Sequence, residues 1–461
     1  MSQQSRICAP KAQTPPYEYE PEAVAQHMGI QLASFLFPLL VALDQLLDKR
    51  LVRTFLQGMQ TIITFRDRLH GLLLSEMGAY LLSPEHERAG TKRLANLLHS
   101  HKWSSHVIDQ FLWSWATTFL CQMEEQGQES FVIWDESVWE KPESLKLEDL
   151  GPVRSSKAHR LTHVKPGYYH PPRRPIFVPG MQWIGLILVG ANTRLGLPVL
   201  AAMRWWSRRG PHAERKRRIE AALLLDCVAS WGRRVVHVFD RGYATQPWLH
   251  LCLALHQRVV VRWPHGQYLI DEQGCARKAW QIARGKRAWG RRQIWNAHLN
   301  RWLETSVLAF RVRHPDFAVP LWLVVSRPGK GRRPWYLLTT EPVETEQQAW
   351  RIVFAYVRRW DIEGTWRFSK SELGFECPRL RTWECCRKLL MMATLAYAFL
   401  LTLAREEMRG LRTWLLLHYC HRTGTKARRA RLPLYRLRLA ISRLWQRSPP
   451  CFALLALRRI S

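Results

Sequence analysis

The sequence predicts a mixed α/β fold in the middle of the chain, with helical regions at both ends. Three observations predict it. Short runs of β-branched and aromatic residues alternate with helical patterns between residues 130 and 263, more strand-like runs follow up to residue 343, and apolar residues recur at helical spacing outside these limits. With 461 residues, 47% hydrophobic and 23% charged, the chain has the size and composition of a globular protein of two or three domains.

The charge of the chain predicts a polyanionic partner. It has 69 Lys and Arg against 37 Asp and Glu, a formal net charge of +32, and nucleic acid is the polyanion that such a balance favours. A basic protein at a membrane surface is the alternative, but the cations are spread through segments that look folded. The apolar run Leu389–Ala404 is shorter than the about 20 residues that span a bilayer, which favours a buried helix.

The cysteines and the N-terminus bear on the compartment. Ten cysteines contain no Cys-x-x-Cys pair, so reduced thiols of a cytosolic protein are the simplest interpretation. The first twenty residues are polar and contain prolines, without the apolar run of a secretory signal.

The first part of the chain is expected to be a flexible tail followed by helices. Apolar clusters at helical spacing run from Pro21 to about Glu125. Within them, residues 92–103 and 104–115 could form two short helices joined by a turn, which leaves a DNA-reading helix-turn-helix and a plain helical bundle both open.

The pattern in the middle of the chain predicts a sheet with helices. The expected elements are a strand that ends in Asp135, a hairpin, a helix, a strand that ends in Asp240, a helix and a last strand, at residues 130–135, 182–189 with 197–205, 212–231, 234–240, 245–256 and 258–263. Residues 321–326 and 335–340 flank a Pro- and Gly-containing turn and predict another hairpin, within a β-rich insertion. The expected regions are a tail (1–20), an N-terminal helical, DNA-binding region (21–127), the first part of the core (128–263), the insertion (264–343), the second part of the core (344–404) and a basic helical C-terminal region (405–461).

The stretch from Tyr356 to Lys370 is the most informative in the chain. If it forms one helix, spacings of three, four and seven place Tyr356, Arg359, Glu363 and Lys370 along one face. A phenol, a guanidinium, a carboxylate and an ammonium suit contact with a phosphodiester beside a metal ion. Arg359 and Glu363 taken alone could be an ordinary i,i+4 ion pair, but such a pair does not account for the other two residues.

Three carboxylates are candidates for metal ligands. Asp135 and Asp240 each end an apolar strand, and Glu363 lies on the later helix. Mg²⁺ prefers oxygen ligands, and two ions held by carboxylates can activate an attacking hydroxyl and stabilise a leaving oxygen. An Asp after a strand is often only a turn or cap residue. Asp240 has more support, because Arg241 and a turn-forming Gly242 follow it.

These residues resemble a known family. Tyr356, Arg359, Glu363 and Lys370 match the Tyr-x2-Arg-x3-Glu-x6-Lys signature of IS4-type DDE transposases, Asp-Arg-Gly-Tyr from Asp240 resembles the second-Asp motif, and Asp135-Glu-Ser resembles the first. The resemblance covers about residues 130–405. It implies an RNase H-like core interrupted by a β-rich insertion, and cleavage of transposon ends followed by strand transfer with Mg²⁺ or Mn²⁺, two ions per active site.

The resemblance also implies roles for individual residues. Asp135, Asp240 and Glu363 would be the catalytic, metal-binding triad. Tyr356, Arg359 and Lys370 would hold the phosphates of the transposon end, with Arg241 beside the second Asp. Many members form a hairpin at the DNA end while an aromatic residue of the insertion stacks on a flipped base, and no local motif assigns that role to one Trp here.

Three basic segments are candidate DNA contacts. Residues 150–213 contain ten Lys or Arg and no acid, residues 277–301 contain eight with Trp280, Trp289 and Trp295 among them, and residues 405–461 contain fourteen against two acids. Cations attract phosphate and aromatic rings stack on bases, although a solvated basic surface and plain hydrophobic packing are the alternatives.

Two further segments stand out. Residues 136–181, Pro-rich and basic, depart from the pattern of commoner members of the family. The helix expected within 428–445 could pack against the protein while presenting arginines to phosphate.

Together these features predict a DNA transposase that acts on transposon-end and target DNA, as a homodimer in the synaptic complex and without a membrane partner. We expect it in the cytoplasm of a prokaryote, associated with the nucleoid when it acts. The alternatives are an RNase H-like metal-dependent nuclease without strand transfer, and an inactive DNA-binding descendant of a transposase.

Overall fold

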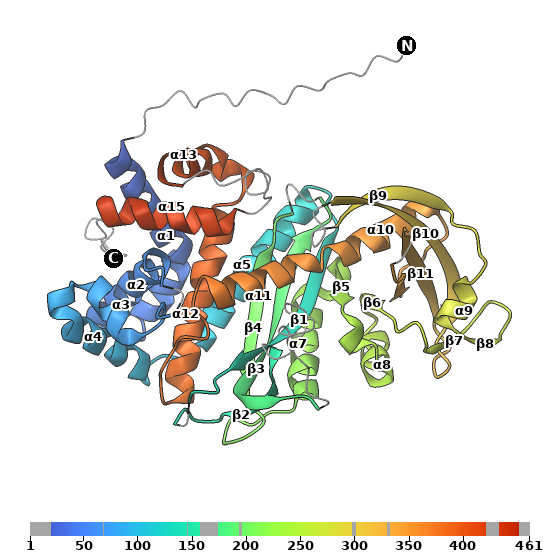
Figure 1. Cartoon of the computed structure of the whole chain (residues 1–461), viewed down its shortest axis with the longest axis horizontal. Helices are drawn as coiled ribbons and strands as arrows, with labels where there is room; N and C mark the ends of the chain where they lie inside the picture. Colours follow the sequence, from blue (N-terminus) through green and yellow to red (C-terminus); the bar gives the residue numbers. More distant parts are fainter. Residues whose placement is uncertain are drawn as a thin grey trace, which may run out of the picture.

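A computed structural model describes residues 20–67, 69–144, 146–156, 174–192, 196–296, 301–329, 332–420 and 433–450. Helices from both ends of the chain lie together at one end of the molecule, a twisted sheet runs through its middle, and a β-rich lobe forms the other end (Figure 1). The expected tail, residues 1–20, lies outside the described residues except for Glu20.

The core is built on five strands whose order follows from the pairing. β1 runs antiparallel to β3 and parallel to β5, β3 pairs with β4, and β5 runs parallel to β6. Numbered along the chain, these five strands lie in the order 3-2-1-4-5, which is the topology of an RNase H-like core. Its elements are β1 (Ser130–Glu140), β3 (Phe177–Gly190), β4 (Val199–Trp206), α7 (Lys216–Trp231), η2 (Gly232–Arg234), β5 (Val235–Phe239), η3 (Arg241–Tyr243), α8 (Gln246–Ala254) and β6 (Arg258–Arg262).

The segment after Asp135 contains more strand than expected. β1 continues five residues past Asp135, and β2 (Gly151–Arg154) adds an edge strand to β3. Residues 157–173, which hold Lys157, Arg160, Lys165 and Arg173 of the basic segment, lie outside the described residues.

The β-rich insertion joins the core sheet directly. β12 pairs antiparallel with β6, so one 12-stranded sheet runs through core and insertion. The edge of β6 would otherwise be left unpaired, and β12 covers it. The predicted hairpin is confirmed as β11 and β12, whereas the long central strand β10 is an addition to the prediction. The insertion consists of β7 (Tyr268–Ile270), β8 (Ala276–Lys278), α9 (Ala279–Ala283), β9 (Gly290–Asn296), β10 (Arg301–Arg313), β11 (Pro320–Pro328) and β12 (Trp335–Thr339).

Side chains alternate between two hydrophobic clusters on the two faces of the core sheet. In β1, Phe131 and Ile133 belong to the cluster shared with α12 and the N-terminal helices, whereas Val132 and Trp134 belong to the cluster shared with α7 and α8. In β5, Val236 and Val238 also face α12. Since side chains alternate along a strand, the next residue in each series, Asp135 or Asp240, is expected on the face of α10, α11 and α12.

The N-terminal helices form a bundle that includes α12. α4 packs against α2, α3 and α12, and α5 packs against β4, so the two do not form the compact pair of a helix-turn-helix. The helices are α1 (Pro21–Asp44), α2 (Lys49–Thr64), α3 (Leu74–Leu81), η1 (Pro84–His86), α4 (Glu87–His99), α5 (His106–Glu125) and α12 (Trp383–Thr402).

Among the residues that the structure describes, two helices, α1 and α12, are long and apolar enough to cross a membrane by length and composition. In α12, 89% of the most apolar window is buried inside the protein. The apolar run near Leu389 is therefore accounted for by the core.

Of the C-terminal helices, α15 packs against α1 and α2, and α13 packs against α15. They are η4 (Glu406–Met408), α13 (Arg409–Tyr419) and α15 (Leu434–Arg447). The expectation that α15 presents its arginines outward is wrong for Arg438, which is fully buried and donates to the backbone oxygens of Ile62 and Phe65. The arginines at 428, 429 and 431 lie outside the described residues.

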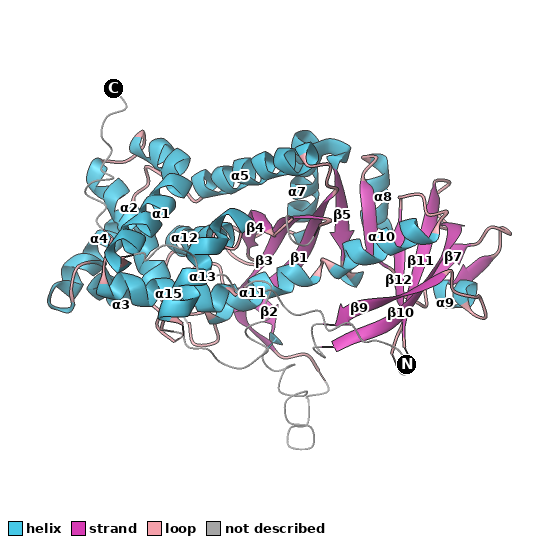
Figure 2. Cartoon of the chain, turned by 90° about the horizontal axis from the view of Figure 1, so that it is seen from above, coloured by secondary structure: helices cyan, strands magenta, loops and turns pink. Residues whose placement is uncertain are grey.

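The stretch from Tyr356 to Lys370 is two helices, not one. α10 (Glu346–Val357) and α11 (Trp360–Ser371) follow one another across the insertion and the core (Figures 1 and 2). Between them, the amides of Arg359 and Asp361 bond three residues back, to Tyr356 and Arg358, as in a 3₁₀ turn. The Arg358 guanidinium donates to Gly196 O at 2.6 Å and pairs with Asp361 at 2.8 Å, which holds the turn against the β3–β4 connection.

Candidate active site

The two strand-end aspartates lie side by side. Ile133 of β1 is paired with Val238 of β5, and Asp135 and Asp240 each follow two residues later. Neighbouring strands are about 4.8 Å apart, and equal offsets place both side chains on the same face. The sheet therefore brings together two carboxylates that are 105 residues apart in the sequence.

Helix α11 brings Glu363 to this face. Tyr356, just before the turn, has its hydroxyl 3.5 Å from Asp240 Oδ1, and the indole N–H of Trp366 donates to Asp135 Oδ2 at 3.0 Å. Glu363 lies between these two contacts along the chain. Its Oε1 accepts from Arg359 at 2.5 Å, the i,i+4 pair that the spacing predicts.

The charges of the three acids and of Arg359 influence one another. Burial is the main cause that raises the pKa of Asp135 to about 7, and repulsion from Asp240 and Glu363 adds to it, while Arg359 acts in the opposite direction. Burial alone would lower the pKa of Arg359, but Tyr356, Glu363 and both aspartates together raise it. Arg359 is thus the cation at the centre of an acidic site.

The other predicted DNA-binding residues differ in accessibility. Arg241 is exposed, and its backbone N–H donates to Asp240 Oδ1 at 2.6 Å. Lys370 donates to Val138 O of β1 at 2.7 Å and lies 5.3 Å from the ring centre of Trp183. Tyr356 is 1% exposed, and burial chiefly raises the pKa of its phenol. Arg241 is thus accessible, Arg359 is buried and paired with Glu363, and Lys370 fastens α11 to β1.

Several residues around the site were not predicted. Trp366 is one, although it lies within the motif stretch, because its partner Asp135 is set by tertiary packing. Arg262 of β6 is another, since it interacts with the Tyr356 hydroxyl from the neighbouring strand. Trp366 could have been noticed as an aromatic residue one turn after Glu363, but nothing in the sequence identifies its hydrogen bond to Asp135.

A second polar cluster lies behind the aspartates, on the α7 face. Lys216 pairs with Glu136 at 2.5 Å and with Glu220 at 3.6 Å, and its Nζ lies 5.7 Å from the ring centre of Tyr243. Burial is the main cause that raises the pKa of Glu220 to about 7. This cluster joins the residue after Asp135 to the Tyr of the Asp-Arg-Gly-Tyr motif, and so supports both strand ends.

The donor set suits a hard divalent cation. The three candidate ligands are all carboxylates, with no His or Cys among them, and oxygen ligands are those that Mg²⁺ and Mn²⁺ prefer. In the arrangement described, no group of three or more His, Cys, Asp or Glu side chains among the described residues is close enough to hold one ion. Burial is the main cause of the raised pKa of Asp135, and repulsion from Asp240 and Glu363 adds to it; a bound cation would relieve that repulsion.

Residues 215–399 match the family model of the transposase DDE domain. This segment begins after Asp135 and includes Asp240, Tyr356, Arg359, Glu363 and Lys370. The match supports a DDE transposase domain in this chain.

A solved structure that is similar to this chain is the cryo-EM structure of a piggyBac transposase synaptic complex with hairpin DNA. The two chains are 9% identical, the similarity covers 72% of this chain and 55% of that chain, and the TM-score is 0.34. The chain thus spans little more than half of that protein.

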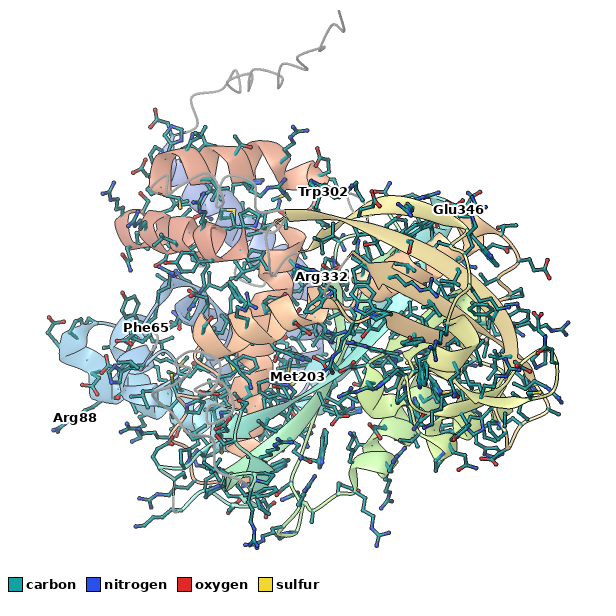
Figure 3. All side chains as sticks on the ribbon, turned by 45° about the vertical axis from the view of Figure 1, so that its right-hand side comes forward. Phe65, Arg88, Met203, Trp302, Arg332 and Glu346 are labelled. Carbon is teal, nitrogen blue, oxygen red and sulfur yellow. The ribbon has the colours of Figure 1, made fainter. Side chains whose placement is uncertain are left out.

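The insertion within the DDE-domain segment exposes two tryptophans. Trp302 is 62% exposed and Trp289 is 41% exposed. Trp302 lies at the tip of the β9–β10 hairpin (Figure 3), where its register partner is Trp295. On β9, the guanidinium of Arg292 lies 5.4 Å from the ring centre of Trp350 on α10, which holds the hairpin against that helix. The side chain of Trp295 lies outside the described residues.

Proposed function

We propose that this protein is an IS4-type DNA transposase that cleaves transposon ends and joins them to target DNA. The observation that carries the proposal is that Asp135 and Asp240 end neighbouring strands of an RNase H-like sheet, and that α11, which carries Glu363, contacts Asp135 through Trp366. Support comes from the match of residues 215–399 to the transposase DDE domain and from the net charge of +32, which suits a DNA substrate.

Asp135, Asp240 and Glu363 are the proposed ligands of two Mg²⁺ ions, or of Mn²⁺. When bound, such a pair lowers the pKa of the attacking water or 3′-hydroxyl and stabilises the leaving oxygen. The contribution of the chain itself is positional. The strand ends fix the two aspartates, and Arg359 holds Glu363 over them while compensating part of the negative charge near an incoming phosphate.

The proposed DNA-binding residues fall into two groups, according to the contacts that each side chain makes in the structure. Arg241 is exposed at the edge of the site and is proposed to bind phosphate directly, and Arg359 to bind the phosphate next to the reacting bond. Tyr356 and Lys370 already bond to Asp240 and to the β1 backbone. They are proposed to reach DNA phosphates by sharing these bonds, so that bound DNA and the strand ends are held by the same two side chains.

The proposed active species is a homodimer that pairs two transposon ends and captures target DNA, in the cytoplasm and nucleoid of a prokaryote. This follows from the chemistry, since joining two ends to one target requires two active sites held together.

The test is cleavage and joining with the cognate element. Wild-type protein, Glu363→Gln and the control Glu344→Gln, an exposed acid before α10, are incubated with labelled ends, supercoiled target and Mg²⁺. We expect joined product from wild type and control and a loss of at least about 100-fold for Glu363→Gln, the scale of losing a preorganised charge. Full activity of Glu363→Gln would reject its role. Cleavage without joining would indicate a nuclease, and binding without cleavage an inactive descendant.

A further inference from the structure

Trp366 occupies a special position in the site. It lies one helical turn after Glu363 on α11 and is 6% exposed. Its indole N–H donates to Asp135 Oδ2 at 3.0 Å. One side chain therefore connects the helix that carries Glu363 to the strand that carries Asp135.

The neighbouring strand β3 has a notch at Gly185, where the absence of a side chain makes room for the Trp366 ring. Gly185 is the register partner of Asp135 in the β1–β3 ladder, and a Cβ at this position would lie 2.1 Å from Cη2 of Trp366. Contacts below 3.0 Å cannot be accommodated without a shift, so any residue other than glycine would push the indole away. The ring also packs against Trp183 of the same strand, with 5.6 Å between ring centres.

The position of the Trp366 ring constrains both the orientation of the Asp135 carboxylate and the position of Glu363. Because the ring is in close contact with both Gly185 and Trp183, its N–H has one direction, and that direction selects the orientation of the Asp135 carboxylate. Because the same ring belongs to α11, the height of Glu363 above the strand ends is set by the same contact. Hydrogen bonds that orient ligating carboxylates commonly change metal affinity 10- to 100-fold when removed.

We propose that Trp366 is a positioning residue, which through its indole N–H and the notch at Gly185 holds Asp135 and Glu363 in the relative arrangement that binds the divalent cations. The inference rests on the proposed function, since it concerns the same carboxylates. The alternative is that Trp366 only fills space in the core, in which case its ring matters and its N–H does not.

Trp366→Phe separates these two roles, because it keeps most of the ring and removes the N–H. Trp205→Phe is the matched control: it belongs to the same aromatic cluster, 4.2 Å from Trp183, and its N–H has no hydrogen-bond acceptor in the described part of the chain. Gly185→Ala attacks the notch from the other strand. If Trp366→Phe does not fold, site-specific incorporation of benzothienylalanine at 366 removes the N–H with the shape of the indole kept.

The readouts are Mn²⁺ affinity by EPR of the full-length chain, the Mn²⁺ concentration for half-maximal end cleavage, and the thermal unfolding midpoint. We expect about tenfold weaker Mn²⁺ binding for Trp366→Phe, an unfolding midpoint close to that of Trp205→Phe, and unchanged Mn²⁺ binding in Trp205→Phe. Gly185→Ala should weaken Mn²⁺ binding and also lower the unfolding midpoint.

Two outcomes would overturn the inference, and they differ. If Asp135→Asn abolishes Mn²⁺ binding while Trp366→Phe binds as wild type does, Trp366 is only core and the proposed function stands. If wild type binds no Mn²⁺ and cuts no DNA, the carboxylates are not a metal site and both proposals fail.

Discussion

At the residue scale, Asp135 carries an energetic cost that can be measured in metal-free protein. Its pKa is raised to about 7, chiefly by burial, from an ordinary value of 3.8. Between these two pH values the folded state holds a proton that the unfolded state has lost, so stability falls as pH rises from about 4 to about 7 and then levels off. At about 1.4 kcal/mol per pKa unit, the whole effect is at most about 4 kcal/mol.

We therefore predict that Asp135→Asn is stabilised relative to wild type in EDTA, by an amount that grows from pH 5 to pH 7.5. The amide cannot ionise and so avoids the cost. Urea denaturation at several pH values measures it, with the exposed Asp226→Asn as control. A constant difference between Asp135→Asn and wild type over this range would contradict the raised pKa.

Arg359 is the second residue whose removal has a predictable sign. It lowers the pKa of Asp135 against the effects of burial and of the other two acids. In Arg359→Gln this pKa should rise further, so the acidic limb of the pH profile of Mg²⁺-dependent cleavage should move up by about one pH unit, the usual scale for one nearby charge. The control is Arg367→Gln, an exposed arginine of the same helix. An acidic limb that does not move, or that moves down, would show that Arg359 acts otherwise.

Residue types and spacing were sufficient to predict the members of the candidate site, because strand-end aspartates and the motif on α10 and α11 are local patterns. They were not sufficient for the contacts. Trp366 was visible in the motif stretch, but its hydrogen bond to Asp135 depends on Gly185, which is 181 residues away and adjacent only through the β1–β3 register. Arg262 was missed for the same reason, since it reaches Tyr356 from another strand.

At the scale of elements, alternating hydrophobicity predicted most strands and helices of the core, but not how the sheet continues. Nothing local indicates that β12 pairs with β6, because this pairing joins strands separated by the whole insertion. The helix expected from Tyr356 onward is interrupted by a tighter turn. Arg358 holds this turn, since it pairs with Asp361 and donates to Gly196 O. The i,i+4 rule still held for Arg359 and Glu363, since Arg359 is the N-cap residue of α11 and Glu363 lies in the first turn of that helix.

The helix α15 supplies a prediction at this scale. The buried guanidinium of Arg438 donates to Ile62 O at 2.6 Å, Phe65 O at 2.7 Å and Ile63 O at 3.2 Å at the end of α2, and also to Glu372 O at the end of α11. It thus ties the C-terminal region to the helix that carries Glu363.

Arg438→Met should leave these carbonyl oxygens buried without a donor and lower the free energy of unfolding by about 3 kcal/mol. Urea denaturation measures the change, and Arg447→Met, an exposed arginine of the same helix, should have little effect. Equal stabilities of the two variants would indicate that water or neighbouring groups replace the guanidinium.

At the scale of the whole molecule, a charge of +32 coexists with a local concentration of acid. The overall field attracts DNA at a distance, whereas the three carboxylates repel the phosphate that must approach them. Divalent cations would reconcile the two, since they convert the acidic site into one that attracts phosphate. DNA binding should therefore respond to salt through the whole surface and to Mg²⁺ through this one site.

This division can be tested with the triple variant Asp135→Asn, Asp240→Asn, Glu363→Gln. In EDTA it should bind transposon-end DNA more tightly than wild type does, because three negative charges are removed where a phosphate lies. Mg²⁺ should tighten binding by wild type but not by the triple variant. Raising salt from 50 to 200 mM should weaken both in parallel, by about 1,000-fold or more if six or more phosphates are contacted. Fluorescence anisotropy with labelled ends measures all three responses, and a triple variant that gained affinity with Mg²⁺ as wild type does would mean that the cations bind elsewhere.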